Sequence, residues 1–137
     1  MTSSRFAYLD ASALVKLAAL EAESAALEHA VLNHEALFTS ELSVVELHRA
    51  MNRTGVPAAA DQADAVLDAM FLAALTPAIR AQAGRLEPAT LRTLDAIHVA
   101  TAVSLALPDL VFVTYDDRQA RAAQAIGLRV LQPGKSV

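Results

Sequence analysis

Residues 110–116 of this 137-residue chain read Leu-Val-Phe-Val-Thr-Tyr-Asp, an apolar run that leads into a carboxylate. An unbroken apolar run of this length predicts a strand that is buried on both faces, as in parallel sheets. Residues 6–10, Phe-Ala-Tyr-Leu-Asp, repeat the pattern near the N-terminus. Because ligands of parallel sheets bind beyond the carboxyl ends of the strands, we expect Asp10 and Asp116 in one crevice.

Short apolar runs alternate with helical patterns along the whole chain. The expected strands are 6–9, 36–39, 71–75, 110–114 and 128–131. The expected helices are 12–17, 21–33, 40–53, 58–70, 76–88, 91–107 and 116–126. This alternation predicts right-handed crossovers and an α/β three-layer sandwich, with a central, mainly parallel sheet of four or five strands flanked by helices.

The composition is typical of a globular protein with one domain, which we expect to span residues 1–137. Hydrophobic residues make up 55% of the chain and charged residues 19%, which excludes extensive disorder. The absence of cysteine excludes a disulfide scaffold, a Cys-based zinc site and a thiol nucleophile. Residues 1–10 lack the apolar segment of a signal peptide, and no run is long enough to span a membrane. We therefore expect a soluble, cytoplasmic protein.

The overall charge and hydropathy indicate what the protein binds. A net charge of −4 argues against a broad basic face for nucleic acid, but it fits a site rich in carboxylates. The mean hydropathy of +0.37 is high for a chain of this size. It predicts apolar surface that a homodimer or another protein partner would cover.

Four carboxylates are candidates for one site. Asp10 and Asp116 follow strands, and two carboxylates that share a crevice repel each other unless a cation lies between them. Glu46 and Asp95 lie in apolar parts of predicted helices, where a carboxylate needs a partner. Hard oxygen ligands of this kind suit Mg²⁺ or Mn²⁺.

Each of the four carboxylates, taken alone, also has a structural explanation. Asp10 and Asp116 are suitable helix N-caps. Glu46 is placed for an ion pair with Arg49 three residues later, and Asp95 suits the first turn of a helix, where it interacts with the helix dipole. Their joint placement favours a common site over four separate roles.

Four motifs together resemble the PIN-domain ribonucleases, and in particular the VapC-type toxins of bacterial type II toxin–antitoxin pairs. The motifs are YLDASALVKL (8–17), SELSVVELHRA (40–50), LRTLDAIHVATA (91–102) and FVTYDDRQARAAQAIGL (112–128). The resemblance implies that Asp10, Glu46, Asp95 and Asp116 are catalytic. It also implies metal-dependent RNA cleavage, a homodimer and inhibition by a cognate VapB-type antitoxin.

Other polar residues lie close to these motifs. The hydroxyls of Ser12 and Thr114 flank the expected pocket, where they either order the metal ligands or only cap helices. Asp117, beside Asp116, is a weaker candidate for a contact to metal or water, and His98 follows Asp95 by one turn, in a core or supporting role. The candidates for phosphate contacts are Lys16, Arg49, Arg53, Arg118 and Arg121.

The sequence favours water as the nucleophile, because it has no cysteine and no evident Ser–His pair. A metal held by Asp10, Asp95 and Asp116 would lower the pKa of a water molecule, and a second metal near Glu46 is an option. Attack by water would leave a 5′-phosphate and a 3′-hydroxyl.

Three other functions remain open from the residues alone. One is a PIN-like nuclease that acts in RNA processing or on DNA without a toxin role. Another is a receiver-type phospho-switch, although such domains have an acidic pair after the first strand, whereas Asp10 is followed by Ala11 and Ser12. The third is a binding module on a degenerate nuclease fold, which the four intact acids argue against.

Overall fold

One sheet of five parallel strands, in the order β3-β2-β1-β4-β5, forms the centre of the molecule. The computed structural model describes residues 5–135, so both ends of the expected 1–137 domain lie outside the described residues. The strands are β1 (Phe6–Leu9), β2 (Ala36–Ser40), β3 (Phe71–Ala73), β4 (Leu110–Val113) and β5 (Arg129–Leu131).

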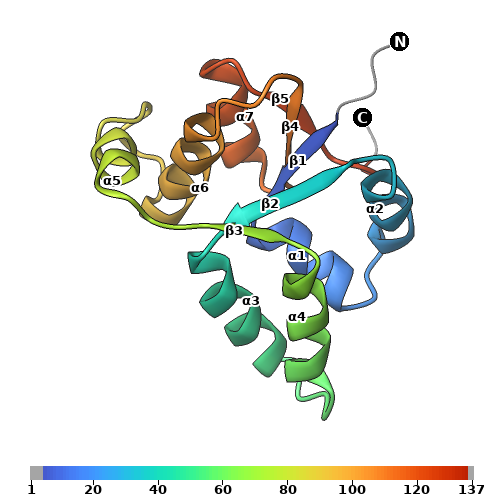
Figure 1. Cartoon of the computed structure of the whole chain (residues 1–137). Coiled ribbons are helices and arrows are strands. Elements are labelled where there is room, and N and C mark those ends of the chain that lie inside the picture. The colour runs from blue at the N-terminus through green and yellow to red at the C-terminus, as the bar shows by residue number, and fades with distance from the viewer. Residues whose placement is uncertain (1–4, 136–137) are drawn as a thin grey trace.

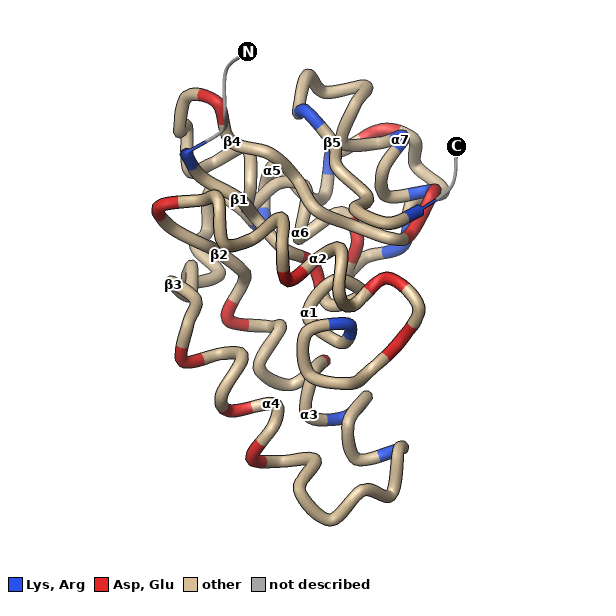
Figure 2. The backbone as a smooth tube through the Cα atoms, turned by 90° about the vertical axis from the view of Figure 1, so that its right-hand side faces the viewer, with Lys and Arg blue, Asp and Glu red and all other residues tan. Residues whose placement is uncertain are grey.

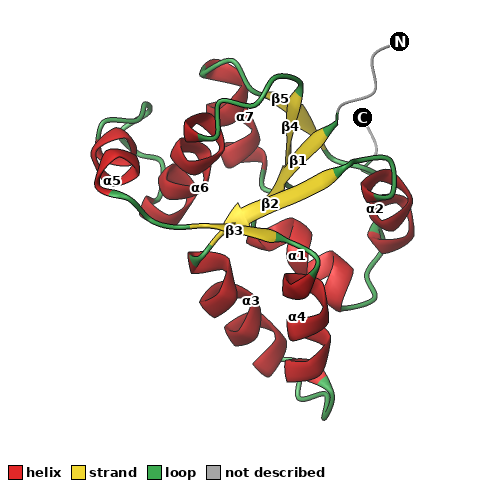
Figure 3. Ribbon diagram, viewed as in Figure 1, coloured by secondary structure: helices red, strands yellow, loops and turns green. Residues whose placement is uncertain are grey.

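Helices cover both faces of this sheet (Figure 3). The helices of the described residues are α1 (Ala11–Ala18), α2 (Ser24–Val31), α3 (Leu42–Asn52), α4 (Ala59–Asp68), α5 (Pro77–Gly84), α6 (Thr93–Ser104) and α7 (Asp117–Ala125). The first four lie on one side of the sheet, and α5, α6 and α7 lie on the other (Figure 1). This three-layer arrangement confirms the predicted fold class.

Alternating side chains of the central strands fill two separate cores. Ala7 and Leu9 of β1 pack with Val111 of β4 toward α1 and α3. Tyr8 points to the opposite face, where its ring stacks on Phe112 with centroids 5.3 Å apart. Both faces of β1 and β4 are therefore buried, which explains why these strands are continuous apolar runs in the sequence.

The elements agree with the expected ranges, except at some ends. Helix α1 begins at Ala11 and not at Ser12, because the carboxylate of Asp10 accepts the amide of Ala13 and caps the helix. Helix α2 begins at Ser24 rather than residue 21, and β3 ends at Ala73 rather than residue 75. No helix in the described part of the chain is long and apolar enough to cross a membrane.

Candidate active site

Asp10 is the most deeply buried of the four candidate carboxylates, with 2% of its surface exposed. It follows β1 directly and lies beside the end of β4, where its backbone amide donates to the carbonyl of Val113 at 3.2 Å. One carboxylate oxygen, Oδ1, accepts the amide of Ala13 at 3.0 Å and the hydroxyl of Ser12 at 2.6 Å. The other, Oδ2, accepts the hydroxyl of Thr114 at 2.5 Å. Asp10 is thus a helix cap and a fixed acid at the same time.

The two hydroxyls that hold Asp10 are themselves held by the loop after β4. The amide of Tyr115 donates to Oγ of Ser12 at 2.9 Å, and the amide of Asp116 donates to Oγ1 of Thr114 at 3.1 Å. Each hydroxyl therefore accepts from the main chain and donates to the carboxylate. This network joins the carboxyl ends of β1 and β4 and places Asp116 next to Asp10.

Burial raises the pKa of Asp10 above its ordinary value, because the charged form loses its hydration. The hydrogen bonds from Ser12 and Thr114 and the nearby His98 act in the opposite direction and offset part of this effect. On balance the pKa of Asp10 stays raised, so burial disfavours the ionised form at this position.

Asp95 and Asp116 share one counter-ion, Arg92. The guanidinium donates from Nε to Oδ2 of Asp95 at 3.1 Å and from Nη2 to Oδ2 of Asp116 at 2.8 Å. The hydrogen bond to Asp95, together with the charges of both acids, raises the pKa of Arg92. Oδ1 of Asp116 caps α7 by accepting the amides of Arg118 and Gln119. Arg92 itself is 66% exposed, so this bridge lies at the mouth of the site.

Glu46 is held by a buried histidine. Nε2 of His98 lies 2.7 Å from Oε1 of Glu46, and its Nδ1 lies 2.7 Å from the hydroxyl of Tyr8. Burial, and then the charge of Asp10, raises the pKa of Tyr8 well above its ordinary value, so the phenol keeps its proton. The imidazole of His98 thus joins the Tyr8 phenol to the carboxylate of Glu46. Glu46 has this partner on α6 in place of Arg49.

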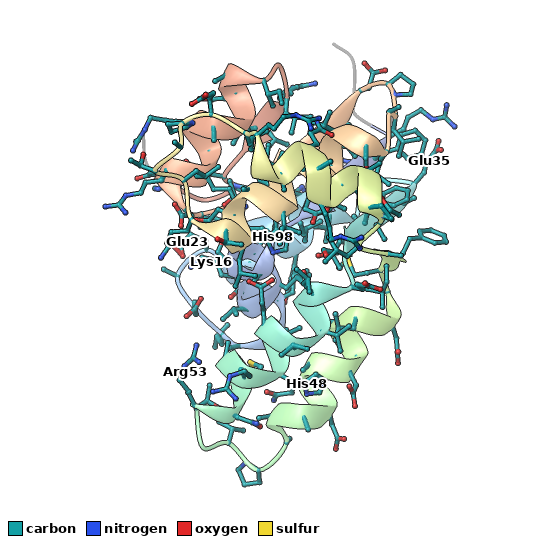
Figure 4. The ribbon with its side chains drawn as sticks, turned by 90° about the vertical axis from the view of Figure 1, so that its left-hand side faces the viewer. Lys16, Glu23, Glu35, His48, Arg53 and His98 are labelled. Carbon is teal, nitrogen blue, oxygen red and sulfur yellow. The ribbon has the colours of Figure 1, made fainter. Side chains whose placement is uncertain are left out.

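The remaining candidates from the sequence lie around this centre with other partners. The carboxylate of Asp117 accepts from Lys135 and Gln132, on the side of β5. The ammonium of Lys16 pairs with Glu21 and Glu23, and Figure 4 shows Lys16 beside Glu23. A contact of Asp117 to metal, or of Lys16 to phosphate, would therefore compete with these existing ion pairs.

The donor chemistry of the four acids fits a hard divalent cation, since all of them offer carboxylate oxygens. Two of them, Asp95 and Asp116, already direct Oδ2 at one cationic group, the guanidinium of Arg92. Among residues 5–135, no three acidic or histidine side chains are grouped closely enough to hold an ion as they stand. Asp10, Asp95 and Asp116 would hold such an ion, and its charge would compete with the guanidinium of Arg92 for Asp95 and Asp116.

Sequence reasoning missed Arg92 and Tyr8. Arg92 precedes Asp95 by three residues, the spacing of a helical ion pair, and this was an available signal. Its second contact, to Asp116, depends on how α6 packs beside α7. The role of Tyr8 was not visible either, because an aromatic residue in a buried strand is usually only a core residue.

Comparison with known proteins identifies the family. The family model described as PIN domain matches residues 7–125. This chain belongs to the PIN-domain family. Ribonuclease VapC46 of Mycobacterium tuberculosis is 41% identical to this PIN domain over 128 residues, which is 92% of the chain and 96% of the relative. The family assignment excludes the receiver-type fold.

Solved structures share the same fold. The sarcin-ricin loop cleaving toxin VapC20 of M. tuberculosis is 18% identical, with a TM-score of 0.71 over 93% of this PIN domain and 99% of that chain. VapBC2 of Rickettsia felis, solved with a promoter DNA fragment, is 14% identical, with a TM-score of 0.64 over 92% and 97% of the two chains.

Tyr8→Phe tests the hydrogen bonds that hold Glu46. The ring still stacks on Phe112, but Nδ1 of His98 loses its hydrogen-bond partner while the imidazole stays buried. We expect a loss of about 1–3 kcal/mol in the free energy of unfolding, measured by urea denaturation. In the control, Tyr115→Phe loses only a donor to the carbonyl of Pro133 and should cost about 0.5–1.5 kcal/mol. Equal effects would contradict the special role of Tyr8.

Asp10→Asn tests the cost of the buried carboxylate. Because the folded protein holds the Asp10 proton more tightly than the unfolded chain, stability from this group falls as pH rises through the window between the two pKa values. Asparagine still caps a helix but has no charge. Without divalent metal, we expect the stability of the variant relative to the wild type to rise by about 0.5–2 kcal/mol between pH 4 and pH 7. A difference that does not change with pH would contradict this account.

Proposed function

We propose that this PIN domain is a metal-dependent endoribonuclease of the VapC type, the toxin of a VapBC-type pair. The observation that carries the proposal is the set of contacts that links these acids beyond the carboxyl ends of β1 and β4. Thr114 joins Asp10 to Asp116, Arg92 joins Asp116 to Asp95, and His98 on α6 holds Glu46. The ribonuclease name of the similar VapC46 supports the same activity.

The residues of the chain prepare this site for a cation and a polyanion. Ser12 and Thr114 fix both oxygens of Asp10, so its orientation is set before anything binds. His98 fixes Glu46 in the same way. Mg²⁺ or Mn²⁺ bound by Asp10, Asp95 and Asp116 would supply Lewis acidity, which activates water and neutralises charge on the phosphodiester. Without such a cation, the acids would repel an RNA backbone.

The proposed partners are a second copy of the chain and a VapB-type antitoxin. Several large apolar side chains are at least 60% exposed, which favours protein contacts over a purely polar surface. They are Leu20, Leu32, Val45 and Phe71. An antitoxin that places an Arg or Lys in the acidic site would act as Arg92 does within the chain, by neutralising Asp95 and Asp116.

RNA cleavage is the direct test of the proposed activity. We expect the wild type to cut single-stranded RNA with Mg²⁺ or Mn²⁺ and to lose activity with EDTA. Asp116→Asn keeps an oxygen that can cap α7 but loses a charged ligand, so cleavage should fall at least about 100-fold. Asp61→Asn, the same change at an exposed position in the first turn of α4, should cleave like the wild type.

The ends of the products test the nucleophile. Attack by water predicts 5′-phosphate and 3′-hydroxyl ends, which mass spectrometry identifies. A 2′,3′-cyclic phosphate would contradict this mechanism, and equal cleavage by Asp116→Asn would contradict the assignment of the site.

Arg92→Gln tests the competition between the guanidinium and a metal ion. The variant removes the cation that bridges Asp95 and Asp116, so a divalent cation no longer has to displace it. We expect the affinity for Mn²⁺, measured by isothermal titration calorimetry without RNA, to rise several-fold.

Arg92→Lys is the matched control, because lysine keeps the charge but cannot form the forked contact to two carboxylates. Its Mn²⁺ affinity should lie between those of the wild type and Arg92→Gln. Unchanged or weaker binding in Arg92→Gln would show that Arg92 supports the cation site and does not compete for it.

A further inference from the structure

A pocket of about 410 Å³ lies next to the acidic site, between α7 and the segment that enters α6. It is lined by residues of this segment and by one face of α7, whose positions 118, 121, 122 and 125 recur at helical spacing. The lining residues are Pro88, Thr90, Leu91, Arg92, Asp95, Arg118, Arg121, Ala122 and Ala125. Apart from Asp95 and Arg92, none of them has a part in the acidic site described above.

The charge of this pocket is opposite to that of the whole chain. Three arginines and one aspartate line it, whereas the chain has a net charge of −4. Figure 2 shows the basic positions along α7 in blue. Arg118 and Arg121 are both exposed, and within residues 5–135 neither forms an ion pair. Their guanidinium groups are thus available to an anion, and Arg92 at the edge is already engaged by Asp95 and Asp116.

The other walls of the pocket are apolar and small. Leu91 is half-buried, and the side chains of Ala122 and Ala125 leave a shallow floor beside the arginines. The volume lies in the range of pockets that hold one small ligand. Apolar side chains beside arginines match a nucleotide, whose base stacks on apolar or guanidinium surfaces and whose phosphate accepts forked hydrogen bonds.

The position of the pocket indicates where along an RNA strand a bound nucleotide would lie. It shares Asp95 and Arg92 with the acidic site, but Asp10 and Glu46 do not line it. It therefore lies to one side of the reacting position, on the side of Asp95 and Asp116. An RNA strand that crosses the four acids would continue over α7.

We propose that this pocket binds a nucleotide of the RNA strand that flanks the cleaved bond. Arg118 and Arg121 hold the phosphate, and the base lies against Leu91, Ala122 and Ala125. The inference rests on the proposed ribonuclease function and adds a positioning subsite to it. Stacking against aliphatic side chains accommodates any base, so we expect the subsite to bind single-stranded RNA.

Binding of RNA without cleavage tests the subsite. The probe is a fluorescein-labelled single-stranded RNA of ten nucleotides with Mg²⁺, and every protein tested carries Asp116→Asn so that the RNA stays uncut. Binding is followed by fluorescence anisotropy between 50 and 300 mM salt. For the double variant Arg118→Gln/Arg121→Gln we expect the Kd to rise about tenfold. The slope of log Kd against log salt should fall by about 0.7, because the two arginines together neutralise one phosphate of a single strand.

Two matched variants separate this subsite from general charge. Arg80→Gln/Arg129→Gln removes the same charge from exposed positions outside the pocket, and its Kd and slope should stay near the wild-type values. Arg118→Lys/Arg121→Lys keeps the charge but loses the guanidinium plane, so the slope should be kept while the affinity falls in part. Size-exclusion chromatography with light scattering checks that all variants keep the same oligomeric state.

The outcomes distinguish the subsite from the function on which it rests. Wild-type protein that cleaves RNA, with a double variant of unchanged Kd and slope, would overturn the subsite alone. A wild type that neither binds nor cleaves RNA would overturn the proposed function as well. Equal losses in the pocket variant and in the Arg80/Arg129 variant would show a general field of charge and would also overturn the subsite. A change only in antitoxin binding or oligomeric state would assign the pocket to a protein partner instead.

Discussion

The buried carboxylate of Asp10 is the constraint on which the rest of the site depends. A charge with 2% exposure is costly in a small protein unless every lone pair finds a donor. The donors here are the amide of Ala13, which comes with the start of α1, and the hydroxyls of Ser12 and Thr114. Because Thr114 directly follows β4, the pairing of β1 with β4 also brings the Thr114 hydroxyl to the carboxylate of Asp10.

The second constraint is the surplus of negative charge beside Asp10. Arg92 neutralises Asp95 and Asp116 together, and the Tyr8–His98 pair orients Glu46. The two arrangements differ in accessibility. His98 is buried and fixed, whereas Arg92 is largely exposed and free to leave. The fold thus keeps the acids ordered while one of their counter-ions stays exchangeable.

Much of the architecture was predictable, because local signals and tertiary packing agree. Apolar runs without alternation predicted strands with two buried faces, and β1 and β4 are buried on both. Thr76 followed by Pro77 predicted the start of α5, where the Thr76 hydroxyl accepts the amide of Ile79. The start of α1 was predicted less well, because Asp10 and Ser12 are both good caps and only the backbone geometry decides between them.

The sequence by itself determined the α/β class, the parallel sheet and the placement of Asp10 and Asp116 at strand ends, since periodicity and chain direction decide these features. The family motifs added Glu46 and Asp95. Only the tertiary structure decided the partners of these acids. Arg92 bridges two of them because α6 and α7 pack side by side, and His98 of α6 reaches both Tyr8 of β1 and Glu46 of α3. Arg92–Asp116, Tyr8–His98 and His98–Glu46 join residues far apart in the chain, so no local pattern encodes them.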